Sequence, residues 1–552
     1  MASFKHLSIL CSSLLCLTIN QIQAAAYNFP FHPPTNMVLE PTSVIVNHPV
    51  TTNNEKAQLF FDQGFTLLYA FNHEESYWSF QKAAELDPNM PMAYWGMAQA
   101  LGPNINMDIT EPREETANSL IQKAIKLLDT VKVTENEKDY INALSFRYSD
   151  NPKANLDKLA MNYSKAMGNL VKKYPDDLDA AVLYGESLMD LNPWDQWTNN
   201  GKPKDNTTDI VSVLESVLKR DPDHLGGNHF YIHAVEASDH PERALMSAER
   251  LRHISPSLGH ILHMPSHIYI LVGDYNLAAI CNEQAIAADK EYINQYGIQG
   301  TYPLHYMSHN MYFLARAYCL EGKLSSALEA AKELENFYDP HFKEMPELEF
   351  YSIATLSALL TFHKWNEILD LPPPNPDMKI NTVLWHYGRA MAFASSDQKD
   401  NAEKEQNAFL DGNKNLPDNA EFGYNEAKTI TKIAQNVLEA KIAEMKGDLA
   451  GAVAALKRAV DIQDGLHYNE PPDWYYPIRQ SLGAVLFRQQ RFKEAEQVFR
   501  DDLDKHPRYG RTLFGLLESL KAQSRPTDAW WVERSLRKAW QYSEVPLSIS
   551  DL

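Results

Sequence analysis

The sequence has few cysteines, no excess of positive charge and no long apolar run beyond its first residues. Four cysteines occur in 552 residues, and only Cys281 and Cys319 lie beyond residue 26, which excludes a disulfide scaffold. Acidic residues outnumber basic ones by 72 to 51 and give a net charge of -21, so the chain repels nucleic acid and anionic lipid. Later segments fall short of the ~20 apolar residues that span a bilayer. We therefore expect no nucleic-acid partner and no membrane span.

Several catalytic motifs are also missing. The sequence has no recognisable Ser/His/Asp arrangement for nucleophilic catalysis, no glycine-rich phosphate loop and no paired-cysteine metal motif. Its histidine pairs lack the HExxH arrangement of the zinc proteases. No particular reaction therefore follows from the motifs.

The first 26 residues have the pattern of an export signal. Lys5 gives a positive start, residues 7–17 are apolar, and three alanines before Tyr27 offer a cleavage site. We expect residues 1–26 to be a signal peptide and residues 27–56 to form an extended N-terminal segment. The mature protein is then exported, either to a periplasm or out of the cell.

Small residues and helix-closing prolines recur along the rest of the chain. The first unit carries Gly64, Phe80, Ala83 and Pro88, and similar units follow at a spacing of about 34 residues, the period of stacked helical hairpins. This pattern resembles the tetratricopeptide repeat family, in particular its exported, divergent bacterial members, with some likeness to the tetratricopeptide repeat protein 38 type.

The resemblance extends from about residue 57 to residue 540. It implies an all-α fold, a right-handed solenoid of helical hairpins in which each repeat buries its apolar face against a neighbour. The run LPPPNPD at residues 371–377 has the composition of a loop. We expect it to be a linker between an N-terminal array at 57–370 and a C-terminal array with its cap at 378–552.

Histidines concentrate in the middle of the chain and form three HxxxH pairs. The pairs are His229/His233, His263/His267 and His305/His309. Residues four apart on a helix share one face, with Cβ atoms roughly 5–6 Å apart. The resemblance places all three pairs on the first helices of successive repeats, and these helices line the concave groove of such arrays.

Three interpretations of this surface remain open. In the first, the six paired histidines and Glu236 bind a transition metal, because neutral imidazoles suit Zn, Cu and Fe and a carboxylate often accompanies them. In the second, the groove binds a ligand without metal. In the third, the histidines are packing residues. The remaining candidate groove residues are Glu186, His260, Tyr312 and Arg316. Trp194 and Trp197 lie in a loop that either overhangs the groove or packs against the repeats.

Two functions are compatible with these residues. The first is an exported binding or scaffold protein whose groove captures a peptide, protein or small molecule, with or without a bound metal. The second is a metal-dependent enzyme, hydrolytic or oxidative, in which Glu236 is a ligand or general base. Arg316 or Tyr312 would then stabilise developing negative charge.

Overall fold

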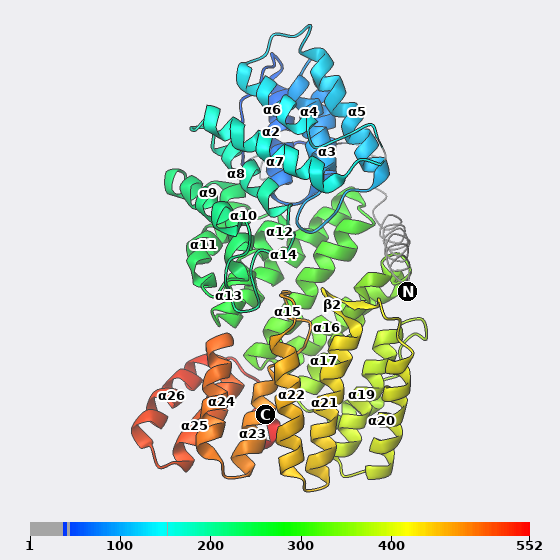
Figure 1. Cartoon of the computed structure of the whole chain (residues 1–552), viewed down its shortest axis with the longest axis vertical. Coiled ribbons are helices and arrows are strands. Elements are labelled where there is room, and N and C mark those ends of the chain that lie inside the picture. Colours follow the sequence, from blue (N-terminus) through cyan, green and yellow to red (C-terminus); the bar gives the residue numbers. More distant parts are fainter. Residues whose placement is uncertain (1–36, 41–44, 152) are drawn as a thin grey trace, which may run out of the picture.

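The computed structural model describes residues 37–40, 45–151 and 153–552 (Figure 1). The expected signal peptide lies outside these residues. The described chain folds almost entirely into helices, apart from the short antiparallel pair β1 (Glu421–Phe422) and β2 (Asn425–Glu426). In this part of the chain no helix is long and apolar enough to cross a membrane. The predicted all-α fold is confirmed.

Consecutive helices pack against each other as hairpins. The hairpins are α2 (Glu55–Tyr69) with α3 (His73–Leu86), α4 (Pro91–Leu101) with α5 (Glu111–Leu127), α6 (Glu135–Ser145) with α7 (Leu156–Lys173), α8 (Leu178–Met189) with α9 (Thr207–Arg220), α10 (Leu225–Glu236) with α11 (Leu245–Ile254), α12 (Gly259–His263) and α13 (Pro265–Leu271) with α14 (Tyr275–Tyr296), α15 (Ser308–Glu321) with α16 (Leu324–Tyr338), α17 (Ala354–Thr361) with α18 (Trp365–Asp370), α19 (Lys379–Ser395) with α20 (Lys399–Lys414), α21 (Ala427–Met445) with α22 (Leu449–Asp464), α23 (Ile478–Arg488) with α24 (Phe492–Lys505) and α25 (Gly510–Ala522) with α26 (Pro526–Ala539). Short irregular helices lie between them: η2 (Pro241–Ala244), η3 (Tyr302–Met307), η4 (Asp339–His341) and η5 (Pro346–Ile353). A last one, η6 (Ile549–Asp551), follows α26. The chain is thus a solenoid of tetratricopeptide-like hairpins.

The aromatic ring of Phe80 shows why small residues recur in the sequence. A Cβ atom added at Gly64 of α2 would lie 2.9 Å from this ring, and one added at Gly96 of α4 would lie 2.4 Å from it. Only glycine therefore lets both first helices approach the aromatic residue of α3. Gly483 and Phe499 repeat the contact at 2.5 Å near the other end of the chain.

Helices α2–α7 lie at one end of the long axis of the molecule, and α19–α26 lie side by side across the other end (Figure 1). One hydrophobic cluster extends from Ala57 to Met378 and includes Tyr509, and a second extends from Ile353 to Leu552. Residues 371–377 contain no helix. The division into two arrays at this segment stays a prediction.

Loops of the C-terminal half return to the middle hairpins. Tyr275 donates its hydroxyl hydrogen to the Pro507 carbonyl at 3.0 Å, and the backbone N–H of Glu544 donates to the Gly322 carbonyl at 3.0 Å. These contacts hold the last hairpins against the start of α14 and the end of α15.

Candidate metal centre

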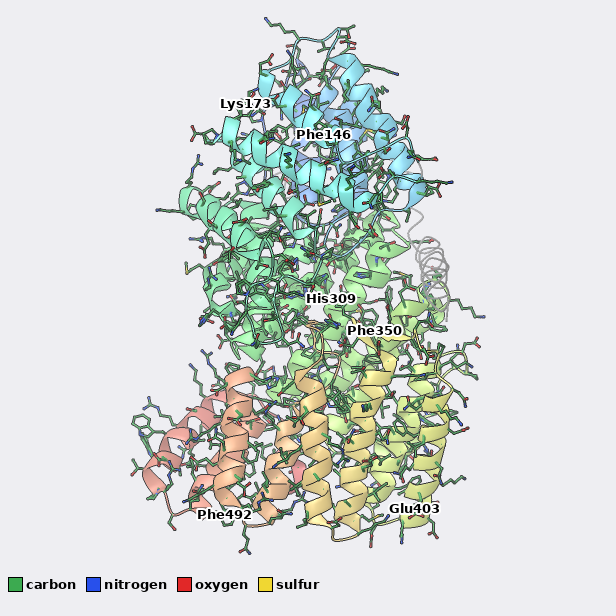
Figure 2. All side chains as sticks on the ribbon, viewed as in Figure 1. Phe146, Lys173, His309, Phe350, Glu403 and Phe492 are labelled. Carbon is green, nitrogen blue, oxygen red and sulfur yellow. The ribbon has the colours of Figure 1, made fainter. Side chains whose placement is uncertain are left out.

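The histidines come together from four neighbouring helices in the middle of the molecule, where Figure 2 places His309. Helix α10 carries His229, His233 and Glu236, α12 carries His260 and His263, α13 carries His267, and α15 carries His309. All of them are buried except His309, which is partly exposed.

Two local breaks shape this region. Pro265 begins α13 one residue after α12 ends; because proline has no N–H, the helical hydrogen bond from position 265 to the Ile261 carbonyl is missing, and His267 N–H donates to the Met264 carbonyl at 3.2 Å. The π-helical segment η3 precedes α15 and shifts the register before His309. Such π-helical turns are frequent at functional sites.

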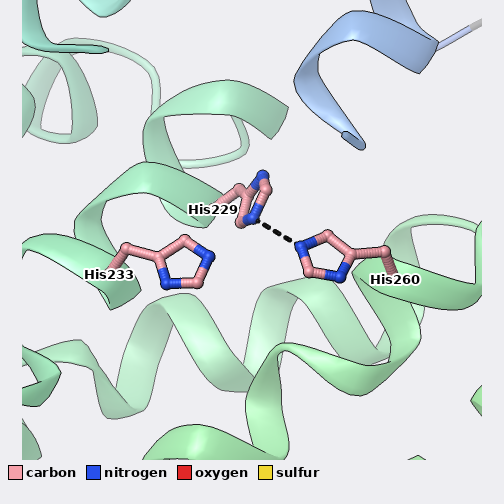
Figure 3. Close-up of side chains that lie close together, drawn as sticks. All are labelled: His229, His233 and His260. Atoms are coloured by element: carbon pink, nitrogen blue, oxygen red, sulfur yellow. Dashed lines mark hydrogen bonds between the residues drawn. The ribbon is translucent and has the colours of Figure 1, made fainter. Parts of the chain in front are cut away.

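The first histidine group consists of His229, His233 and His260, whose rings face a common space (Figure 3). One ring nitrogen of each lies within 4.8 Å of the others, and the Nε2 atoms of His229 and His260 are 3.1 Å apart. The Nδ1 atom of His229 lies 2.6 Å from the Tyr69 carbonyl, and that of His233 lies 2.7 Å from Glu236 Oε1. Both acceptors orient the rings so that Nε2 faces the group.

The second group consists of His263, His267 and His309. Its ring nitrogens also lie within 4.8 Å of one another. The Nε2 atom of His263 lies 2.8 Å from that of His267 and 3.1 Å from that of His309. Glu236 Oε2 accepts from His267 Nδ1 at 2.6 Å, so one carboxylate orients a histidine of each group.

Hydrogen bonds fix the tautomers of His263 and His267. Asn282 donates its Nδ2 hydrogen to the Ala278 carbonyl at 2.7 Å, so its Oδ1 must accept from His263 Nδ1, 2.7 Å away. His267 Nδ1 donates to Glu236. Both Nε2 atoms therefore present lone pairs to each other at 2.8 Å. Between two neutral rings this contact is repulsive, so either a metal ion or a shared proton must lie between the two nitrogens.

The electrostatics favour neutral imidazoles around an ionised carboxylate. Burial, followed by the neighbouring histidines, lowers the pKa of His229, His260 and His309 well below its usual value. Burial also lowers the pKa of His263. For Glu236 burial raises the pKa, but the interaction with His267 and the hydrogen bonds from two histidines outweigh it and leave the pKa below its ordinary value. Neutral imidazole is the form that binds metal.

The two groups form one continuous cluster. Ring centroids within the groups are between 4.7 Å (His263–His267) and 6.2 Å (His233–His260) apart. Between the groups His233 and His267 are 5.6 Å apart, and His260 and His263 are 5.9 Å apart. Ions held by the two groups would therefore be neighbours.

Aromatic side chains enclose the cluster. Phe71 lies 4.6 Å from His229, and Phe313 lies 5.1 Å from His263, both as ring-centroid distances. Trp194 stands edge-on to His233 at 5.3 Å. Its loop is anchored by Trp197, whose indole N–H donates to the Ala234 carbonyl at 2.8 Å. The expected overhanging loop thus covers the first group.

The other candidate residues lie outside the two groups. His305 is partly buried in η3, and burial lowers its pKa to about 4. Tyr312 packs against Tyr351 at a ring distance of 5.6 Å. Burial and the charge of Asp190 raise the pKa of Glu186. Arg316 is buried, with its Nε and Nη1 atoms unpaired in the described chain.

A third group of possible ligands lies elsewhere. It contains His48, Asp177 and Asp179. The carboxylate of Asp179 already accepts from His48 Nδ1 at 2.7 Å and from the Tyr69 hydroxyl at 2.8 Å. We interpret this group as an ion pair that holds the N-terminal segment against the first repeats.

Sequence reasoning missed two residues beside the histidines. Tyr468 donates its hydroxyl hydrogen to Glu236 Oε2 at 3.0 Å. Glu470 lies in the same loop, and burial together with the charge of Glu236 raises its pKa well above the usual value. No pattern links residues that are 232 positions apart, so only the folded chain shows this contact.

No family model and no curated protein matches the sequence. Solved structures are similar over most of the chain. Human IFIT1, as a dimer with m7Gppp-AAAA, is 12% identical, with 95% of this chain and 99% of that chain covered and a TM-score of 0.31. A chain of the APC/C hetero-tetramer Cut9-Hcn1 is 11% identical, with coverages of 96% and 80% and a TM-score of 0.32. Yeast Tom70 is 11% identical, with 89% of this chain and 93% of that chain covered and a TM-score of 0.28. At these TM-scores the matches carry no conclusion about function.

Proposed function

We propose that this protein is an exported metal-binding protein whose buried histidine cluster holds two neighbouring transition-metal ions. The contact between His263 Nε2 and His267 Nε2 carries the proposal, because two lone pairs at 2.8 Å need a cation. Metal–nitrogen bonds of ~2.0–2.1 Å place two ligands of one ion roughly 3 to 4 Å apart, close to the spacing in both groups.

The ligand chemistry narrows the choice of metal. Each ion would have three imidazole nitrogens and no sulfur, a set that suits Cu, Zn or Fe and disfavours Mg and Ca. Both oxygens of Glu236 accept hydrogen bonds from histidines. In this arrangement Glu236 orients ligands and supplies negative charge to the centre, rather than binding an ion itself.

The main competing explanation is a single proton shared by His263 and His267, with Glu236 as its counterion. Metal analysis separates the two. The full chain should be stripped with a chelator, incubated with Cu, Zn or Fe salts, desalted and measured by elemental mass spectrometry. We expect about two ions per chain for the preferred metal, one for each group of three ligands.

The variants His263→Ala and His229→Ala each remove one ligand from one group and should each lower the metal content. His253→Ala is the matched control, because this exposed histidine pairs only with Glu249 on the surface. Absence of bound metal in the wild type, or equal binding by all four proteins, would overturn the proposal.

The open coordination positions favour metal-dependent catalysis as a second function. Three protein ligands leave room for water or substrate, as in catalytic zinc sites. Glu470 lies near the centre, where burial and the charge of Glu236 raise its pKa, so its carboxyl is the candidate group for proton transfer. In the metal-loaded protein, Glu470→Gln should retain metal but reduce turnover of a chromogenic ester or the oxidation of a catechol. Lack of turnover in wild type with both ions bound leaves metal binding as the function.

A further inference from the structure

A cavity of about 260 Å³ lies beside the first histidine group. It is larger than an engineered cavity of roughly 150 Å³ that holds benzene. Its wall includes Glu40, Glu75, Glu291, Tyr292, Tyr296 and Tyr302, together with His260. We call this space the Tyr292 pocket. Its lining extends from His260, which is buried, to Glu291, which is exposed.

The charged side chains described in the pocket wall are acidic. Three of the described lining residues are glutamates, and none of the described lining residues is a lysine or arginine. Glu40 accepts from the Tyr296 hydroxyl at 2.9 Å, and Glu75 accepts from Asn72 Nδ2 at 3.0 Å. Burial raises the pKa of Glu75 to about 8, so this carboxyl is mostly protonated near pH 7 and contributes little to the negative charge of the wall. A cation in the pocket would supply the positive charge that the wall lacks.

The aromatic side chains of the pocket wall also favour a cation. The ring of Tyr292 stands edge-on to that of Tyr302 at 5.0 Å, and it lies 5.5 Å from that of Tyr296. Faces of phenol rings attract ammonium groups, and the attraction grows when the cation is shielded from water. Carboxylates beside aromatic rings are therefore suited to an organic cation.

An independent observation comes from His260. The residue is only 5% exposed, its Nε2 faces His229, and its Nδ1 has no hydrogen-bond partner. When Nε2 binds an ion, Nδ1 carries the hydrogen and needs an acceptor. Since His260 lines the pocket, a ligand there can provide that acceptor.

We propose that the Tyr292 pocket binds a small organic cation that carries a hydroxyl or carbonyl oxygen. The ammonium group lies among the tyrosine rings and glutamates, and the oxygen accepts from His260 Nδ1. The oxygen contact rests on the proposed metal centre, whereas the cation site rests on the cavity alone.

The test uses the full, metal-loaded chain and isothermal titration calorimetry. The probes are choline, ethanolamine, tetramethylammonium and 3,3-dimethylbutan-1-ol, which has the shape of choline without its charge. We expect choline or ethanolamine to bind, the neutral alcohol to bind at least about tenfold more weakly, and tetramethylammonium, which lacks the oxygen, to bind several-fold more weakly than choline.

Two variants keep the test independent of folding. Glu40→Gln removes the carboxylate that accepts from Tyr296, and Glu291→Gln removes one at the exposed rim; each should weaken choline binding several-fold. Glu115→Gln, on exposed α5, should leave it unchanged. Binding of neither choline nor ethanolamine, or equal binding of choline and its neutral analogue, would overturn the cation site. Equal binding of choline and tetramethylammonium would overturn the His260 contact.

Metal content measured on the same samples separates the two proposals. If the protein holds two metal ions but binds no organic cation, only the proposal for the Tyr292 pocket is overturned. Cation binding by a protein that holds no metal overturns the metal centre and the His260 contact, while the charge and aromatic preference of the pocket stand.

Discussion

Tyr468 donates a hydrogen bond to Glu236 across a sequence separation of 232 residues, with 3.0 Å between its hydroxyl oxygen and Glu236 Oε2. Glu236 therefore accepts from one histidine of each group and from a loop of the C-terminal half. The late repeats thus stabilise a centre whose ligands all come from the middle repeats.

Tyr468→Phe should weaken metal binding without removing a ligand. The variant keeps the ring but loses one of the hydrogen bonds that hold Glu236, and the loss of such a supporting contact costs roughly tenfold or more in metal affinity. Competition with a chromophoric chelator measures the change. Tyr542→Phe, at a half-exposed tyrosine near the C-terminus, is the control. Unchanged affinity in Tyr468→Phe would show that Glu236 is held by the histidines alone.

Glu236→Gln should have a larger effect than Tyr468→Phe. One side-chain oxygen becomes an NH₂ group, which then faces the Nδ1 hydrogen of His233 or His267. The mismatched histidine must turn or change tautomer, so we expect a loss of about 10- to 100-fold in affinity. The same chelator titration measures it. Comparing the two variants shows whether Glu236 or Tyr468 contributes more to metal affinity. An equal loss of affinity in both would contradict the assignment of Glu236 as the shared acceptor.

Much of the fold was predictable because the repeat pattern is local. Gly64, Phe80 and Ala83 recur at a fixed spacing, and the structure shows the contact that requires it. The proximity of His229 and His233 was predictable for the same reason, since both lie on α10 and residues four apart on a helix share a face.

The grouping of the histidines was not predictable from that spacing. The pair His305/His309 is divided by the end of η3, and only His309 joins a group. His260, expected as a groove residue, contacts His229 of the preceding repeat. These outcomes depend on a π-helical turn and on the packing of neighbouring helices, and neither has a signature in sequence periodicity.

Gly96→Ala should destabilise the first repeats. The new methyl group would lie 2.4 Å from the Phe80 ring, which is fully buried and has little room to move. Overpacking of this kind costs about 1–3 kcal/mol. Urea denaturation measures the loss in the free energy of unfolding. Gly465→Ala is the control, because its nearest neighbours are backbone atoms at 3.5 Å. Equal stability of the two variants would contradict the proposed role of glycine in the repeat contact.

The pair formed by His48 and Asp179 should make stability depend on pH. Burial lowers the pKa of His48, but the hydrogen bond and charge of Asp179, with the charges of Asp177 and Asp62, outweigh it and raise the pKa above its usual value. A raised pKa in the folded state stabilises the protein fully below about pH 6.5, and the stabilisation is lost as the pH rises through the folded-state pKa.

Replacing His48 with glutamine tests this dependence on metal-free protein. The wild type should be more stable than His48→Gln, and the difference in their free energies of unfolding should be larger at about pH 5.5 than at about pH 8.5. We expect this difference to change between the two pH values by about 1 kcal/mol for each unit by which the pKa of His48 is raised. Urea denaturation at both pH values measures the difference. His253→Gln provides the comparison at an exposed histidine outside this pair. A difference between wild type and His48→Gln that is the same at both pH values would mean that His48 holds the N-terminal segment by packing and neutral hydrogen bonds, not by its charge.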